Sequence, residues 1–278
     1  MALIYGKEIR EEMKRDFTEW SQDKDLELVV LRIGDDPSSQ FYLKGIQSYA
    51  KETPVKVSIF QYSEKTSEQR ILRAIDDLNR DPNVNAVLLQ KPFPESINEN
   101  ALINALLPLK DIEGIHPVNL GKVINGEKGV KPVTPKSAIK ILKHNLIEIS
   151  GKKVAILGRS TIVGSPLALM LTREDATVTL CHSKTRNLKK ITLDSDIVVA
   201  SVGKAGFVTP EMISAKCVLV DVGANVDENG SMVGDVTPEA VAKAAIATAV
   251  PGGVGVLTVA ELFDNLRILY DLQQSQLY

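Results

Sequence analysis

The sequence predicts an α/β protein with two domains, each built around a parallel sheet. A length of 278 residues suits two domains of ordinary size. Short apolar, β-branched runs alternate with segments of helical periodicity, which is typical of parallel strands joined by crossover helices. The stretch 153–171 has the pattern of a strand, a tight turn and a helix, which is the first half of a βαβ unit.

The N-terminal half predicts a small parallel sheet that helices cover on both faces. The predicted strands are 26–33, 55–62 and 84–90. The predicted helices are 8–20, 38–52, 67–79 and 97–107. Asp36 is placed to cap the second of these helices, with Pro37 at the first helical position, and Thr66 is placed to cap the third. Ligands of such sheets bind beyond the carboxyl ends of the strands.

Two side chains are candidates for a site at that edge of the sheet. Gln90 lies at the carboxyl end of the third predicted strand, and Tyr42 lies on the first crossover helix. Tyr42 shares one helix face with Ile46 and Tyr49, because the three follow one another at helical spacing. Core packing is therefore the alternative interpretation of Tyr42.

The stretch 153–166 predicts a site for an anion. Its apolar run ends at Gly158, and Pro166 is placed near the first position of the helix that follows. Such a turn aims backbone N–H groups and the positive end of the helix at one point, which in α/β proteins usually holds a phosphate. Of the three slots of the dinucleotide fingerprint, Gly158, Ser160 and Val163, only the first is glycine. An ordinary strand-to-helix turn is the alternative.

The next predicted strand, 176–181, bears on the choice of nucleotide. NAD sites usually place an acid on the ribose about 20 residues beyond the glycines. The segment 182–186 contains no acid, and its Ser183, Lys184 and Arg186 would instead bind a 2′-phosphate. A dinucleotide bound here would therefore be NADP rather than NAD. The alternative for this segment is a solvated polar loop.

The rest of the C-terminal half continues the second domain. Its predicted elements are a domain boundary at 131–135, a helix at 136–145, strands at 197–201 and 218–222, and a last helix at 258–271. Three glycines in four residues, Gly252, Gly253 and Gly255, would let the backbone approach a flat ligand closely. The alternative is a loop that merely precedes the last helix.

Composition excludes several classes of partner. A net charge of −2 predicts no nucleic-acid or anionic-membrane partner. No apolar run approaches the roughly 20 residues that span a bilayer, and the first ten residues lack the apolar core of a signal peptide. Cys181 and Cys217 are expected to be small core residues of a cytoplasmic protein. His116, His144 and His182 lie too far apart to predict a metal site.

Taken together, these motifs resemble the bifunctional methylenetetrahydrofolate dehydrogenase/methenyltetrahydrofolate cyclohydrolases over nearly the whole chain. The stretches that carry the resemblance are 34–42, Gln90 with the prolines after it, 110–117, 158–166, 181–185, 221–223, 233–236 and 251–255. The resemblance implies a folate-binding catalytic domain over 1–135, with a helix at 258–278 packing back on it. It also implies a Rossmann NADP-binding domain over 136–257, a folate cleft between the domains, and a homodimer.

The resemblance also implies roles for individual residues. Those implied to bind NADP are Thr134, Gly158, Arg159, Ser160, Ser183 and Ala224, with Arg159 and Ser183 near the 2′-phosphate. Those implied to contact folate are Tyr42, which stacks on the ring system, Gln90 near the reacting centre, Glu113 on the pterin edge, and the wall made by Pro251, Gly252, Gly253, Val254 and Gly255. Glu113 stands where the family has aspartate.

The implied chemistry has two steps. Hydride passes from the bridging methylene of 5,10-methylenetetrahydrofolate to NADP, and water then opens the methenyl product to 10-formyltetrahydrofolate. For proton transfer in the second step the family uses a lysine four residues after the tyrosine, where this sequence has Ile46. Lys44 points away on the helix, so we hypothesise that Lys91 supplies the ammonium. The alternatives are an enzyme with dehydrogenase activity alone and a nucleotide-sensing binding protein.

Overall fold

The computed structural model describes residues 1–228 and 230–275, and it divides into two compact units. Unit 1 consists of Met1–Glu11 and Thr134–Thr258, and unit 2 consists of Glu12–Val133 and the chain from Val259 onward. The three crossings between units fall inside helices, namely α1 (Lys7–Ser21), α6 (Val133–His144) and α10 (Val254–Ser275). The two-domain α/β class that the sequence predicts is confirmed.

The sheet of unit 2 has three parallel strands in the order β3-β2-β4. The strands are β2 (Leu26–Ile33), β3 (Val55–Tyr62) and β4 (Ala86–Gln90). In this register Arg32, near the carboxyl end of β2, lies between Gln61 of β3 and Gln90 of β4. The last residues of the central strand are therefore flanked by polar side chains on both sides.

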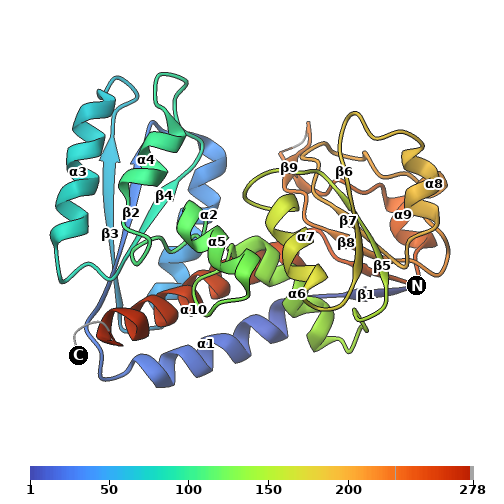
Figure 1. Ribbon diagram of the computed structural model, residues 1–278, viewed down its shortest axis with the longest axis horizontal. Coiled ribbons are helices and arrows are strands. Elements are labelled where there is room, and N and C mark those ends of the chain that lie inside the picture. Colours follow the sequence, from blue (N-terminus) through green and yellow to red (C-terminus); the bar gives the residue numbers. More distant parts are fainter. Residues whose placement is uncertain (229, 276–278) are drawn as a thin grey trace. The chain divides into compact units, whose positions relative to one another are not determined.

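Helices cover both faces of this sheet, as the sequence predicts (Figure 1). Leu28 and Val30 of β2 pack with side chains of α2 (Pro37–Ala50) and α10 in one core cluster. Val29 and Leu31 pack on the other face with α3 (Glu68–Arg80) and α4 (Glu99–Ala105). Neighbouring residues of a strand point to opposite faces, so a strand that is buried on both faces needs the continuous apolar run seen here.

The sheet of unit 1 has six parallel strands in the order β1-β11-β8-β7-β5-β6. They are β1 (Ala2–Ile4), β5 (Lys153–Leu157), β6 (Thr177–Cys181), β7 (Ile197–Ala200), β8 (Val218–Asp221) and β11 (Ile246–Thr248). The edge strand β1 was not predicted, because three residues carry no periodic signal and its pairing partner lies far away in the sequence. Beside this sheet β9 (Asn225–Val226) and β10 (Met232–Val233) form a short antiparallel pair.

The remaining helices are short. They are α5 (Pro117–Asn125), α6 (Val133–His144), α7 (Gly164–Thr172), α8 (Leu188–Leu193), α9 (Pro238–Lys243) and the 3-10 turn Pro210–Met212. Within residues 1–228 and 230–275, we find no helix with the length and apolar character needed to cross a bilayer.

Helix starts are where the structure corrects the sequence prediction. The helix α7 begins at Gly164, so Pro166 is its third residue, where the missing N–H still costs no intrahelical bond. Thr66 closes a turn by donating its N–H to the carbonyl of Ser63, so Ser67 rather than Thr66 precedes α3. The last helix begins at Val254 instead of 258, which places the last of the three clustered glycines inside the helix.

Candidate functional site

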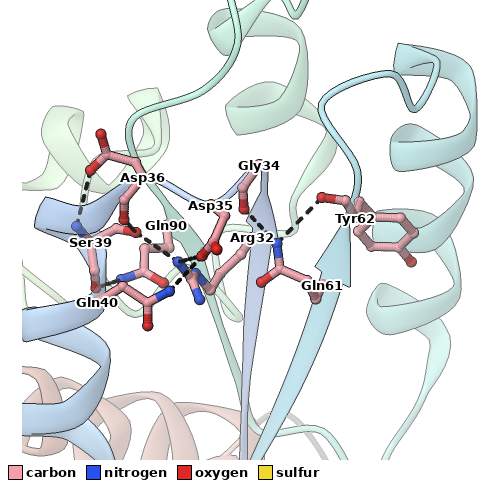
Figure 2. A network of polar contacts seen from close by, with 9 residues as sticks. All are labelled: Arg32, Gly34, Asp35, Asp36, Ser39, Gln40, Gln61, Tyr62 and Gln90. Atoms are coloured by element: carbon pink, nitrogen blue, oxygen red, sulfur yellow. Dashed lines mark hydrogen bonds and ion pairs between the residues drawn. The ribbon is translucent and has the colours of Figure 1, made fainter.

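A buried polar network lies at the carboxyl end of the sheet of unit 2 (Figure 2). Arg32 exposes 5% of its surface, and its Nη2 donates to Ser39 Oγ at 2.8 Å. Gln90 exposes 4%, and its Nε2 donates to the backbone carbonyl of Ser39 at 2.7 Å. The arginine and the glutamine come from neighbouring strands and meet on the same residue of α2.

The first turn of α2 holds Ser39 in place. The N–H of Ser39 donates to Asp36 Oδ1 at 3.1 Å, and its hydroxyl donates to the backbone carbonyl of Asp36 at 2.7 Å. Asp36 is the N-cap residue that the sequence predicts, and this assignment is confirmed. Arg32 also forms a longer ion pair of 3.7 Å with Asp35 in the loop before the helix.

The amide of Gln90 has one atom left for a ligand. Its Oε1 is buried and has no hydrogen-bond partner among the residues that the structure describes. Because a buried acceptor without a donor costs free energy, such an atom indicates a place that a ligand or water fills. The sequence-predicted position of Gln90 at a strand end is confirmed, since it is the last residue of β4.

On the helix α2, Tyr42 differs in burial from the residues around it. Tyr42 is half-buried and packs against the apolar core cluster, whereas Ile46 and Tyr49 are fully buried in it. Lys44 is exposed. Position 46 therefore contributes an apolar side chain to the core, whereas Tyr42 is only partly buried.

Glu113 lies in a loop that a buried aspartate fixes. Asp111 exposes 3% of its surface and accepts hydrogen bonds from the N–H of Gly114, the N–H of His116 and the side-chain amide of Asn119 at 2.8 to 3.1 Å. Burial, together with the negative charge of Asp111, raises the pKa of Glu113 to about 7. Glu113 can therefore change its charge near neutral pH.

Lys91 lies close enough to influence this carboxyl group. Its Nζ forms an ion pair with Glu99 of α4, and its positive charge opposes the rise in the pKa of Glu113. Lys91 is partly buried, with 25% of its side chain exposed. The structure thus brings Tyr42, Gln90, Lys91 and Glu113 into unit 2.

The turn between β5 and α7 in unit 1 leaves no room for a side chain at its two glycines. Gly158 adopts φ +113°, and a Cβ there would lie 2.2 Å from the carbonyl oxygen of Ser201. A Cβ on Gly164 would lie 2.0 Å from the carbonyl of Gly158. Arg159 and Ser160 are exposed at the tip of the turn, in front of the N-terminus of the helix. The N–H of Val163 donates to Ser160 Oγ at 3.2 Å, and the N–H of Ser165 donates to the carbonyl of Ser160 at 3.0 Å. This tight turn in front of a helix N-terminus has the shape of a cradle that fits a pyrophosphate.

The loop after β6 has the character expected for a 2′-phosphate site. Thr185 Oγ1 accepts the N–H of His182 at 2.8 Å and closes the loop on itself. Ser183, Lys184 and Arg186 are exposed, and no acid interrupts them. The NADP preference that the sequence predicts therefore rests on side chains that are free to face a ligand.

Two buried aspartates hold the loops beyond β7 and β8, and the sequence analysis assigned them no role. Asp235 exposes 0% of its surface and accepts hydrogen bonds from the N–H groups of Val202, Gly203 and Lys204 at 2.5 to 2.9 Å. Asp221 accepts the N–H groups of Gly223, Asp235 and Val236 at 2.9 to 3.1 Å. Burial raises the pKa of Asp221 to about 6. The signal in the sequence is that both aspartates lie in stretches that carry the family resemblance, Asp221 in 221–223 and Asp235 in 233–236.

The other predicted ligand contacts also belong to unit 1. Ala224 is exposed just after the loop that Asp221 holds, and Thr134 is half-buried in α6. Pro251 and Gly252 lie in the turn before α10, whereas Gly253 ends it, and Val254 and Gly255 begin the helix. A Cβ on Gly255 would meet no heavy atom within 4 Å, so packing does not explain this glycine. Among the described residues no group of three or more His, Cys, Asp or Glu is arranged to hold a metal ion.

Two family models match the chain. The catalytic domain of tetrahydrofolate dehydrogenase/cyclohydrolase matches residues 4–113, and the NAD(P)-binding domain of the same family matches residues 132–274. A relative from Syntrophomonas wolfei named bifunctional protein FolD 2 is 52% identical over 267 residues, covering 96% of this chain and 98% of the relative.

Solved structures of similar proteins agree along the whole chain. The bifunctional FolD methylenetetrahydrofolate dehydrogenase/cyclohydrolase of Campylobacter jejuni has a TM-score of 0.93 at 33% identity, covering 98% of this chain and 99% of that one. The Trypanosoma brucei enzyme, solved with NADP cofactor and an inhibitor, has a TM-score of 0.92 at 29% identity and covers 98% of each chain. Since both family models match and together span most of its length, the chain belongs to the tetrahydrofolate dehydrogenase/cyclohydrolase family.

Proposed function

We propose that this protein oxidises 5,10-methylenetetrahydrofolate to 5,10-methenyltetrahydrofolate with NADP and hydrolyses the product to 10-formyltetrahydrofolate. The observation that carries the proposal is Gln90 Oε1, a buried acceptor without a hydrogen-bond partner among the described residues. It lies beside the helix of Tyr42, within the part of the chain that matches the family's catalytic domain. A relative named bifunctional protein FolD 2 supports it, as does the Campylobacter jejuni structure, whose name gives both activities.

In the first step the chain's own residues bind and orient. NADP, when bound, accepts the hydride that leaves the methylene carbon. The turn at Gly158 and Ser160 is proposed to bind the pyrophosphate of NADP, and Arg159 and Ser183 are proposed to bind its 2′-phosphate. Thr134 and Ala224 are the further proposed contacts. The NADP-bound structure of the Trypanosoma brucei relative supports this choice of coenzyme.

On the folate side, Tyr42 is proposed to stack on the ring system, and Glu113 to accept hydrogen bonds at the pterin edge. Tyr42 is only partly buried as a residue, which is compatible with stacking. Pro251 to Gly255 is proposed as a wall of the folate site. Holding the reacting carbon in line is the main contribution that a protein makes to hydride transfer.

The second step needs proton transfer. The oxygen of water bonds to the methenyl carbon, the bond from that carbon to N5 breaks, N5 takes one proton and another is released. Because Ile46 is buried in the apolar core, that position supplies no proton. Lys91 is the proposed source, and its ion pair with Glu99 holds the ammonium in one place.

The proposed domain limits are 1–135 for the folate domain and 136–257 for the coenzyme domain, with the helix at 258–278 on the former. The gap between the two family models, which end at 113 and begin at 132, supports a boundary near 135. The division into compact units, which assigns the chain from Val259 onward to unit 2, supports the separate assignment of the last helix. Residues 276–278 lie outside the described part of the chain, and β1 pairs in the sheet of unit 1.

A homodimer in the cytoplasm completes the proposal. In the described sheet of unit 2, β3 is an edge strand on which Ile59 and Phe60 are exposed at 38% and 39%. An edge strand with exposed apolar side chains is suited to pairing with a second copy. Cys181 and Cys217 are free and buried, which fits a reducing compartment.

The test of the proposed function is an assay of the wild-type protein in which NADPH and the methenyl product are followed separately. With 5,10-methylenetetrahydrofolate we expect NADPH to form, and NAD to be the poorer acceptor. We also expect the methenyl product to disappear faster than it does in buffer. Accumulation of methenyl product at the buffer rate would indicate a dehydrogenase alone, and no NADPH at all would favour the nucleotide-sensing protein.

The raised pKa of Glu113 predicts a pH dependence. Its carboxyl group is protonated below about 7 and ionised above, and only the ionised form accepts every hydrogen bond at the pterin edge. The KM for methylenetetrahydrofolate should therefore rise as pH falls through 7, by up to about tenfold per pH unit. In Glu113→Gln this rise in KM with falling pH should be absent. Exposed Glu95 gives the matched control, because Glu95→Gln should keep the wild-type profile. A rise retained in Glu113→Gln would exclude this role.

Removal of the Lys91 ammonium tests the hydrolysis step. Lys91→Ala should slow hydrolysis of the methenyl product about 10²- to 10⁴-fold, which is the usual contribution of a positioned acid or base. Because Lys91 also lowers the pKa of Glu113, rates are best compared near pH 9, where that carboxyl group is ionised in both proteins. Exposed Lys44 provides the control variant, Lys44→Ala. An unchanged hydrolysis rate in Lys91→Ala would reject the assignment.

A further inference from the structure

Arg32 is a buried cation that no step above uses. Its guanidinium lies at the end of the central strand, where 5% of the residue is exposed. Taking such a charge out of water is costly unless partners compensate for it. The carboxylate of Asp35 is 3.7 Å away and 80% exposed, so solvent screens this pair strongly. The hydrogen bond to Ser39 Oγ is therefore the close contact that defines the position of the guanidinium.

Ser39 links Arg32 to Gln90. Arg32 donates to the hydroxyl of Ser39, and the amide of Gln90 donates to the carbonyl of the same residue (Figure 2). The hydroxyl itself donates a hydrogen bond to the backbone carbonyl of Asp36. Ser39 is thus held both by the guanidinium of Arg32 and by the first turn of α2. The position of its backbone carbonyl is fixed as a result.

This link sets the orientation of the Gln90 amide. A backbone carbonyl can only accept, so the atom of Gln90 that faces Ser39 must be the Nε2 donor. The Oε1 acceptor is then turned to the other side of the amide, where it is buried without a partner among the described residues. A rotation of the amide would lose the bond to Ser39 and present a donor to the ligand in place of an acceptor.

We propose that Arg32 is a positioning residue for the folate reactions, which acts through Ser39 to hold the Gln90 amide with Oε1 towards the reacting ligand. The proposal rests on the proposed function. The planar guanidinium suits this task because it stays charged when buried and donates in a fixed direction. Arg32 also supplies a fixed positive charge on this face of the sheet, where Ile46 contributes only an apolar side chain.

The test compares Arg32→Met, Ser39→Ala and the double variant with the wild type. For each folate reaction that the wild type performs, Arg32→Met should lower kcat about 10- to 100-fold, as expected for a misplaced group near the reacting atoms. The KM for NADP should stay within about twofold of the wild-type value, because unit 1 is untouched. Ser39→Ala should lower the same kcat, and the double variant should be no slower than Arg32→Met, since both changes break one link.

Two further variants keep the test decisive. Arg32→Lys preserves the charge and should recover part of the kcat lost in Arg32→Met. Arg80→Met removes an arginine of the same unit that is 77% exposed, and should leave kcat unchanged. Full kcat in Arg32→Met, or losses that multiply in the double variant, would overturn the proposal. A wild type without either folate activity would instead overturn the proposed function.

Discussion

The loops beyond the carboxyl ends of both parallel sheets are held by buried carboxylates, and the candidate sites depend on this constraint. Parallel strands end with backbone N–H groups that lose water when the loops pack, and each needs an acceptor. Asp235 and Asp221 provide acceptors in unit 1, and Asp111 provides them in unit 2. Because one carboxylate accepts several N–H groups at once, the path of a whole loop is fixed by a single side chain.

The same constraint explains why the chemically useful groups lie at these loops. Glu113 follows Asp111 by two residues, and the negative charge of that aspartate is one cause of its raised pKa. In the other unit, Ala224 follows the loop that Asp221 holds. At the end of β2 the buried charge is positive, and Arg32 holds the start of a helix rather than a loop. Charges that are buried to fix the backbone thus also set the electrostatics of the sites.

Much of the fold could be predicted from the sequence, and much of the detail of the site could not. The strands 26–33 and 55–62 were predicted to the residue, because an apolar run in the first and alternation of apolar and polar residues in the second are typical of strands. The turn at Gly158 was visible as a strand that ends in glycine. The role of Arg32 was not, because burial of a charged residue depends on strands and helices far away in the sequence. The start of α10 at Val254 was missed because glycine-rich sequence favours a loop until packing decides otherwise.

The two proposed reactions together require NADP and folate to bind at the carboxyl ends of the two sheets. A crystal structure with NADP and a folate analogue bound tests it most directly. We expect the pyrophosphate at the turn of Gly158, the 2′-phosphate against Arg159 and Ser183, and a ligand donor within hydrogen-bond distance of Gln90 Oε1. A pyrophosphate bound elsewhere, or a folate ring remote from Tyr42 and Gln90, would contradict it.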